Sequence, residues 1–412
     1  MKKVLLSICT ILLLLTACSL TFKDEEEIPK QENTVEPDAS QEEVNPKEEW
    51  IEDTLDNLSL EEKIGQMLIV SDYNTSMTDE LLTNFNEVKP GGFILFGENI
   101  KSYEQTTNLI KDIKNTSNIP LFISIDQEGG RVQRIKKLPD TTVSIIPPMY
   151  NLGLTNDTNL AYEVGKVIGE ELRVFDINMD FAPVLDIYSN PKNTVIGTRS
   201  FGKTSEVVSK MAIPFAKGLE ETNILPVYKH FPGHGDTLED SHNTLPIINK
   251  TKEELMEMEL KPFIEAIKND AKIIMVSHLA IPKITNDNTP ASLSKVIVTD
   301  LLKEELGFDG LVITDALNMK ALTNEYTEEE IYMNAINAGV DILLMPDFDI
   351  ETIDIIKNAI LNQEISEERI NESVKKILNL KYDLLEEENT YTKEYLGSIE
   401  HQEIISKIDE AN

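Results

Sequence analysis

The sequence predicts an α/β fold, a (β/α)8 barrel of the TIM type, and two observations indicate it. From residue 50 onward, eight short apolar runs alternate with segments that have helical spacing and charge. Continuous apolar runs between helices are typical of parallel strands that are buried on both faces. Polar residues also collect where nearly every run ends, and a barrel places all of these ends on one face. A doubly wound parallel sheet is the alternative, and the clustered polar ends favour the barrel.

Eight units of a strand and a helix follow one another over about 330 residues, with the strands expected at 64–70, 92–96, 121–125, 178–184, 225–228, 272–276, 311–313 and 341–344. Helices are expected between them, for example over 251–269, 295–306 and 327–338, and a final amphipathic helix over 370–385. Apolar spacing over 391–407 predicts a short surface helix in the acidic segment that follows. We therefore expect one barrel domain over 49–385 and an acidic tail over 386–412, without a second α/β domain.

Five of the expected strands end in polar residues that can carry chemistry. They lead into Asp126, Asp186, Lys229-His230, Ser277-His278 and Thr314-Asp315. Ordinary polarity at strand ends would explain any one of them. Because the carboxyl ends of barrel strands converge on one pocket, we expect these side chains to meet there.

Composition excludes some classes of function. The chain has 412 residues, 38 Lys and Arg against 73 Asp and Glu, and a net charge of -35. Nucleic-acid binding is not expected, because clustered Lys and Arg supply phosphate contacts. Both cysteines, Cys9 and Cys18, lie in the first 20 residues, so the body can contain no disulfide or zinc-thiolate framework.

The N-terminus has the features of an export signal. Two lysines precede an apolar stretch over residues 4–15, which is short for a bilayer crossing of roughly 20 residues. Leu15-Thr16-Ala17-Cys18 resembles the lipobox of bacterial lipoproteins, in which the cysteine is acylated. We expect a signal peptide over 1–17, lipidation of Cys18 and an acidic disordered tether over 18–48, since this segment has few large apolar residues. The working domain would then lie outside the cytoplasm, anchored to the membrane.

A long loop after the fifth strand holds three of the five histidines, His230, His234 and His242. Loops of this length in compact domains are often functional. One interpretation is acid/base catalysis, with Asp240 orienting the imidazole of His242. Another is a divalent metal bound by these histidines with His278 and Asp315. A third is that the histidines only order the loop, which we favour for His234.

Four motifs resemble those of family 3 glycoside hydrolases, and within them the β-N-acetylglucosaminidase branch. They are DQEGGRVQR at 126–134, IGTRSF at 196–201, KHFPGHGD at 229–236 continuing to DSH at 240–242, and ITDALNM at 313–319. They occur in the family's order over roughly residues 50–385.

The resemblance assigns roles residue by residue. It implies that Asp315 is the nucleophile, His242 the general acid/base and Asp240 its partner. It also implies that the sugar before the scissile bond is held by Asp126, Arg134, Arg199, Lys229 and His230. A retaining glycosidase needs such a carboxylate and a proton donor, and histidine can exchange protons near neutral pH.

The expected function is that of a retaining exo-β-N-acetylglucosaminidase without a metal or other cofactor. Export and the motifs together indicate GlcNAc-MurNAc fragments of peptidoglycan as substrates. A histidine base would not repel phosphate, so phosphorolysis is an alternative, as is a broader β-glycosidase activity. A metal-dependent barrel hydrolase and a non-catalytic lipoprotein that binds wall sugars are the alternatives from other classes.

Overall fold

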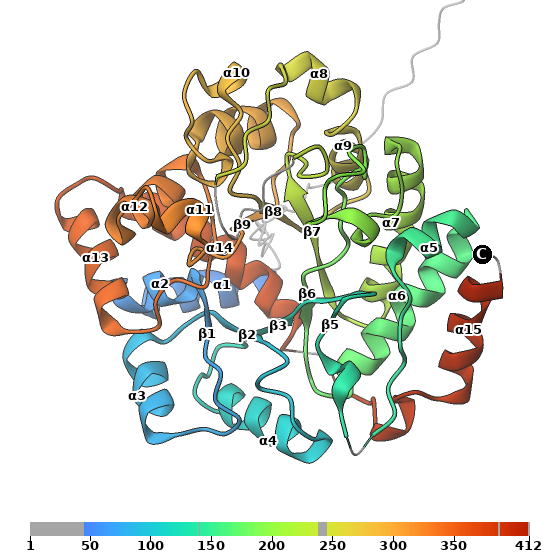
Figure 1. Cartoon of the computed structure of the whole chain (residues 1–412). Helices are drawn as coiled ribbons and strands as arrows, with labels where there is room; N and C mark the ends of the chain where they lie inside the picture. Colours follow the sequence, from blue (N-terminus) through green and yellow to red (C-terminus); the bar gives the residue numbers. More distant parts are fainter. Residues whose placement is uncertain (1–44, 140, 238–244, 386–387, 411–412) are drawn as a thin grey trace, which may run out of the picture. The chain divides into compact units, whose positions relative to one another are not determined.

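Eight parallel strands form the centre of the chain (Figure 1). A computed structural model describes residues 45–139, 141–237, 245–385 and 388–410. Neighbours in the sheet follow the order β10-β1-β2-β3-β6-β7-β8-β9. The strands are β1 (Leu68–Ser71), β2 (Gly92–Leu95), β3 (Phe122–Ile125), β6 (Met179–Asp180), β7 (Leu225–Phe231), β8 (Ile273–Val276), β9 (Leu311–Thr314) and β10 (Leu343–Leu344). An antiparallel pair, β4 (Gln127–Gly129) and β5 (Val132–Gln133), extends beyond the end of β3.

The sheet closes on itself between its last and first strands. Strand β10 pairs in parallel with β1, with Leu68 opposite Leu343. A parallel bridge between Ile313 and Ile342 joins β9 to the residues just before β10. All eight expected strands are present in the expected order, so the prediction of a (β/α)8 barrel is confirmed.

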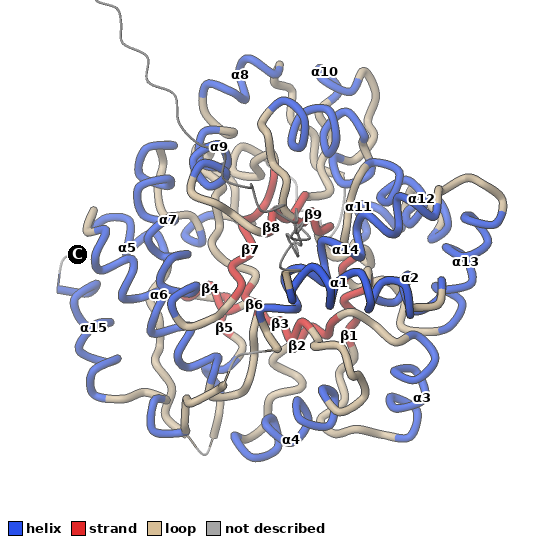
Figure 2. The backbone as a smooth tube through the Cα atoms, turned by 180° about the vertical axis from the view of Figure 1, so that it is seen from behind, coloured by secondary structure: helices blue, strands red, loops and turns tan. Residues whose placement is uncertain are grey.

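Helices surround the strands (Figure 2). They are α1 (Pro46–Asn57), α2 (Leu60–Gln66), α3 (Asp79–Val88), α4 (Tyr103–Lys114), α5 (Met149–Thr155), α6 (Thr158–Arg173), α7 (Ser205–Glu221), α8 (Lys252–Glu257), α9 (Lys261–Lys268), α10 (Pro282–Thr285), α11 (Lys320–Thr323), α12 (Glu328–Ala338), α13 (Ile350–Leu361), α14 (Glu367–Asp383) and α15 (Ile399–Glu410). Short 3-10 turns cover Ile135–Lys137, Gly197–Arg199, Ala291–Leu293 and Lys393–Tyr395, and Val296–Glu305 is a π-helix. Among the residues described, no helix combines the length and the apolar character that a bilayer crossing requires.

Local sequence sets where several helices begin and how closely they pack. Capping boxes start α2 at Ser59, α8 at Thr251 and α12 at Thr327. Helices α6 and α7 approach closely at Gly165 and Gly218. A Cβ on Gly165 would lie 2.0 Å from the carbonyl oxygen of Phe215, so no larger residue fits there.

Three expected segments differ from the structure in their details. The apolar run 64–70 begins inside α2, because the capping box at Ser59 starts a helix that continues to Gln66 before β1 begins. The expected helix over 251–269 is two helices, α8 and α9. Met258 leaves the helical conformation between them, and Pro262 lies in the first turn of the second. The segment 295–306 is helical as expected but contains the π-helix.

Helix α14 covers the end of the barrel at which the strands begin. Its residue Lys381 is fully buried, and Nζ donates to Gln66 Oε1 at 2.7 Å and to the Gly91 carbonyl oxygen at 2.8 Å. These acceptors precede β1 and β2, and the ring of Phe122 lies 5.0 Å from the same nitrogen. Burial without an ion-pair partner among the described residues lowers the pKa of Lys381 to about 7.

The C-terminal helix α15 folds back against α6. The short helix expected over 391–407 is confirmed, with bounds closer to the C-terminus. His401 is buried, and its Nε2 and Nδ1 lie 2.7 Å from Glu170 Oε2 and 3.2 Å from Glu171 Oε1. Burial opposes protonation, but the two carboxylates outweigh it and raise the pKa of His401 to about 9.

Replacing His401 with Gln should therefore destabilise the protein in a pH-dependent way. The folded pKa is raised from 6.5 to about 9, so the stabilisation is fully present below pH 6.5 and is lost as the pH rises through about 9. Denaturant unfolding should give a free energy about 2 kcal/mol lower for His401→Gln at pH 6. The difference should shrink toward pH 9.5. A difference that stays constant over this range would contradict the ion-paired histidine.

Candidate active site

A cavity of about 500 Å³ opens where the barrel strands end. Residues that follow β3, β7 and β9 line it, together with the loop that contains Arg199. Part of its lining is apolar and includes Phe96, Phe181 and Met319. Charged side chains make up much of the rest. The cavity brings together six of the predicted site residues, namely Asp126, Arg134, Arg199, Lys229, His230 and Asp315.

Five of the charged side chains form a row of alternating sign. Arg134 Nη2 lies 3.2 Å from Asp126 Oδ2, and Lys229 Nζ lies 2.7 Å from Asp126 Oδ1. The same lysine nitrogen lies 2.6 Å from Glu128 Oε1. Arg199 donates through Nε and Nη2 to the two oxygens of Glu128, at 2.7 Å each. Three cations therefore face two carboxylates, which we call the ionic row.

Mutual attraction keeps the ionic row charged in spite of its burial. Burial is the largest influence on Asp126 and Glu128 and opposes ionisation, but the neighbouring cations hold the pKa of each carboxyl below its usual range. For Lys229 and Arg199 burial opposes the positive charge, and the carboxylates nevertheless raise the pKa of each. The row therefore offers fixed, charged hydrogen-bonding groups at neutral pH.

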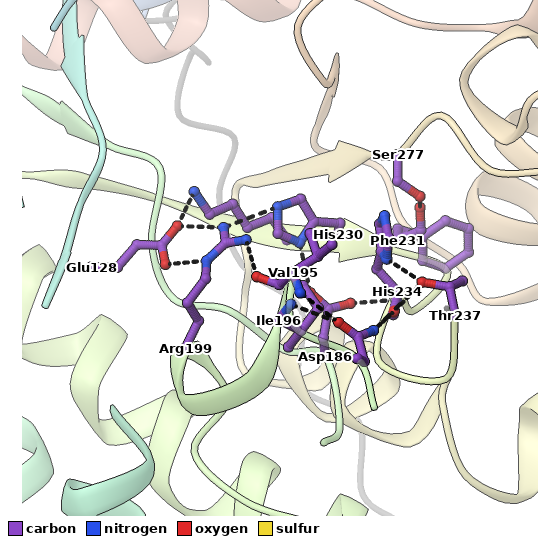
Figure 3. Close-up of polar contacts among 12 residues, drawn as sticks. Glu128, Asp186, Val195, Ile196, Arg199, His230, Phe231, His234, Thr237 and Ser277 are labelled. Carbon is purple, nitrogen blue, oxygen red and sulfur yellow. Dashed lines mark hydrogen bonds and ion pairs between the residues drawn. The ribbon is translucent and has the colours of Figure 1, made fainter. Parts of the chain in front are cut away.

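His230 continues from the ionic row toward a buried aspartate (Figure 3). Its Nδ1 lies 2.6 Å from Asp186 Oδ2, and its Nε2 lies 3.4 Å from Arg199 Nη2. The other oxygen of Asp186 accepts from the backbone nitrogen of His234 at 2.6 Å. Asp186 is fully buried. Because its two oxygens contact His230 and His234, it holds both ends of the 230–234 segment in place.

Asp315 follows β9 and is only partly buried at the cavity wall. Its backbone nitrogen donates to the Val276 carbonyl oxygen at 2.9 Å, and its Oδ1 accepts from the Ala316 nitrogen at 2.8 Å. Burial opposes ionisation, but the hydrogen bond from the Ala316 nitrogen and the positive charge of Lys229 favour it, and the pKa of Asp315 is lowered. The side chain is thus an anchored carboxylate that is ionised at neutral pH.

His278 orients the backbone beside Asp315. It is fully buried, with Nε2 at 3.0 Å from the Ala316 carbonyl oxygen and Nδ1 at 2.7 Å from Ser292 Oγ. A carbonyl oxygen only accepts, so Nε2 carries the hydrogen and Nδ1 accepts from the serine. Burial lowers the pKa of His278 and favours this neutral form.

The expected acid/base pair, Asp240 and His242, lies outside the described residues, as does Cys18. The segment that leads to the pair is firmly held up to Thr237. His234 Nδ1 lies 2.8 Å from Thr237 Oγ1 (Figure 3). Asn193 Nδ2 donates to the His234 carbonyl oxygen at 2.8 Å. His234 has the loop-ordering contacts that the sequence favoured for it.

The metal hypothesis invoked three histidines that the structure describes, and all three are engaged with protein groups. His230, His234 and His278 each contact a side chain or a carbonyl oxygen, as described above. Within the described ranges, no three His, Cys, Asp or Glu side chains form a group suited to a metal ion.

Two residues of the site were not assigned a role from the sequence. Glu128 lies inside the DQEGGRVQR motif, and Asp186 ends the fourth expected strand. A signal was available for Glu128, because Lys229 and Arg199 are two expected cations that need a shared counterion when buried.

Comparison with known proteins identifies the family. Residues 59–380 match the model of the glycosyl hydrolase family 3 N-terminal domain. The chain belongs to glycosyl hydrolase family 3. It is thus a glycoside hydrolase, and the resemblance noted in the sequence is confirmed at the level of the family.

Similar family 3 proteins include β-hexosaminidases. Beta-hexosaminidase A of Pseudoalteromonas piscicida is 34% identical over 335 residues, which make up 74% of this chain but only 56% of that protein. The β-hexosaminidase of Tolumonas auensis is 39% identical over 261 residues, 62% of this chain and 75% of that protein. A family 3 β-N-acetylglucosaminidase from a Paenibacillus strain superposes with a TM-score of 0.80 at 36% identity, covering 86% of this chain and 69% of that one.

Replacing Asp186 with Asn tests the support of His230. The carboxylate accepts from both His230 and His234, whereas an amide has one acceptor oxygen, so one donor would face an NH2 group. We expect a loss of about 1–3 kcal/mol in the free energy of unfolding and reduced hydrolysis of an aryl β-glycoside. Denaturant unfolding and steady-state assays measure both.

Asp270→Asn is the control, because the side chain of Asp270 is 83% exposed beside Lys272. It should change stability by less than about 0.5 kcal/mol. Unchanged stability and turnover in Asp186→Asn would show that Asp186 does not hold His230.

Proposed function

We propose that this chain is a retaining exo-β-N-acetylglucosaminidase that removes terminal β-linked GlcNAc. The observation that carries the proposal is the presence of the ionised Asp315 and the ionic row in one cavity of about 500 Å³, a size usual for small-molecule sites. The similarity to proteins named β-hexosaminidase and β-N-acetylglucosaminidase supports the choice of an N-acetylated sugar.

In the proposed reaction Asp315 attacks the anomeric carbon of the sugar. A C–O bond forms to Asp315 while the bond to the leaving oxygen breaks, and that oxygen takes a proton from His242. Neutral His242 then removes a proton from water, which attacks the same carbon and releases Asp315. Two displacements restore the original configuration, and Asp240 would stabilise the imidazolium form of His242.

Polar groups of the ionic row are proposed to hold the sugar. Lys229, Arg134 and Arg199 offer N–H donors to hydroxyl and acetamido oxygens, and Asp126 accepts from hydroxyl groups. Charged partners make such hydrogen bonds roughly twice as strong as neutral ones. Because these groups are fixed by one another, little reorganisation is needed when a sugar enters.

We also propose GlcNAc-MurNAc fragments of peptidoglycan as the physiological substrates. The support is the export signal in the sequence, which would place the enzyme where the cell wall is. The tether expected over 18–48 must end earlier, because α1 begins at Pro46. Lipidation at Cys18, with the acidic segment that precedes α1, would keep the barrel domain at the outer face of the cell membrane.

Asp315→Asn should abolish turnover of an aryl β-N-acetylglucosaminide. The amide is a poor nucleophile, and loss of a covalent nucleophile lowers kcat by on the order of 10⁴-fold or more. The assay is release of the aryl alcohol, run with GlcNAc, glucose and xylose glycosides and with or without phosphate and a chelator. Undiminished turnover by Asp315→Asn would overturn the assignment.

The other arms of the same panel separate the alternatives. Preference for a glucoside or xyloside would remove the specificity while leaving the family intact. A sugar phosphate product would show phosphorolysis. Loss of activity on chelation would show a metal-dependent enzyme, and binding of GlcNAc without turnover would show a binding protein.

Cys18→Ala tests the proposed anchor. The wild-type protein should sediment with membranes and incorporate labelled fatty acid, because acyl chains on Cys18 supply the membrane affinity. The variant should lose the label and shift to the soluble fraction. Equal labelling and sedimentation of the two proteins would contradict lipidation at Cys18.

A further inference from the structure

Glu128 connects the two cations on either side of it. It lies on β4, is 1% exposed, and uses both oxygens. Oε1 lies 2.6 Å from Lys229 Nζ and 2.7 Å from Arg199 Nη2, while Oε2 accepts from Arg199 Nε at 2.7 Å. The contact with Arg199 is therefore a two-pronged fork, which fixes the plane of the guanidinium as well as its position.

No other carboxylate in the described part of the chain forms ion pairs with both cations. Asp126 shares Lys229 but pairs through its other oxygen with Arg134. The other contacts of the guanidinium are longer and uncharged, since Arg199 Nη1 lies 3.3 Å from the Val195 oxygen and Nη2 lies 3.4 Å from His230 Nε2. The orientation of Arg199 therefore depends chiefly on Glu128.

The orientation of Arg199 in turn constrains His230. Arg199 Nη2 lies 3.4 Å from His230 Nε2, and a guanidinium can only donate. Nε2 must then be the accepting nitrogen, and Nδ1 carries the hydrogen that points to Asp186 Oδ2 at 2.6 Å. Figure 3 shows this continuous path from Glu128 through Arg199 and His230 to Asp186.

We propose that Glu128 is a positioning residue that determines which donors and acceptors Arg199 and His230 present to the bound sugar. The role rests on the proposed function, because it concerns how that same cavity recognises its substrate. Without the negative charge, Lys229 and Arg199 would lose their common counterion. The guanidinium would then be free to turn toward other carboxylates, of which Asp186 already attracts it.

Glu128→Gln tests the proposal, because the amide has nearly the same shape but no charge. Fixed orientation of binding groups acts on the bound sugar and on the transition state alike, so its loss raises KM more than it lowers kcat. We expect KM for an aryl β-N-acetylglucosaminide to rise about tenfold, with kcat within about threefold of the wild-type value. The inhibition constant of free GlcNAc should rise by a similar factor.

Asp341→Asn is the matched control. Asp341 is 1% exposed and also lies between a lysine and an arginine, with Lys303 Nζ at 3.1 Å and Arg369 Nη2 at 3.0 Å. It precedes β10, at the end of the barrel away from the cavity, and does not line the cavity. Both variants should lose stability in denaturant unfolding, but only Glu128→Gln should change KM.

Three outcomes separate the possibilities. Wild-type KM in folded Glu128→Gln, or an equal KM increase in Asp341→Asn, would overturn the positioning role and leave the proposed function intact. Failure of the wild-type protein to cleave any β-N-acetylglucosaminide would instead remove the function.

A second variant serves if Glu128→Gln does not fold. Glu128→Asp keeps the charge, but its side chain is one methylene too short to reach both cations. Its KM should rise by an intermediate factor, and a wild-type KM would again overturn the proposal.

Discussion

The burial of Lys229 between two carboxylates is the interaction on which the site depends. A lysine that is 2% exposed loses most of its hydration, and this cost is offset only where opposite charges lie at hydrogen-bond distance. Asp126 and Glu128 meet that requirement from the residues after β3, while Lys229 itself belongs to β7. The ionic row therefore ties together segments that are about 100 residues apart in the sequence, and it leaves charged groups facing the cavity. Asp180 lies close to the row without adding charge at neutral pH, since burial raises its pKa to about 8.

The fold could be predicted from the sequence because its strands are buried on both faces and so appear as unbroken apolar runs. What could not be predicted depends on contacts between distant residues. By composition the C-terminal segment is an acidic tail, yet Ile405 and Ile408 are buried against the barrel and His401 finds two glutamates on α6. Lys381 is similar, because nothing in its neighbourhood in the sequence shows that it enters the barrel end under Gln66 and Gly91.

For the site, as for the fold, the sequence predicted the main residues but not all of the contacts between them. Motif resemblance and strand-end polarity identified six residues that the structure brings to one cavity. Residue type alone did not distinguish a carboxylate that faces a ligand from one that holds another side chain in place. For this reason Glu128 was overlooked, and Asp186, although expected near the pocket, was given no role. The charge of the site also differs in sign from that of the chain. The net charge of the whole chain is -35, whereas the ionic row at the cavity has three cations against two carboxylates.

The central claim is that Asp315 becomes covalently bonded to the sugar, and trapping that bond tests it most directly. A GlcNAc-based substrate with a reactive leaving group and a fluorine substituent that slows the second step would be incubated with the wild-type protein, which is then digested and analysed by mass spectrometry. One sugar attached to the peptide that contains Asp315 is the predicted result. Attachment at Asp126 or Glu128, or a first-formed product of inverted configuration without any attachment, would contradict the account.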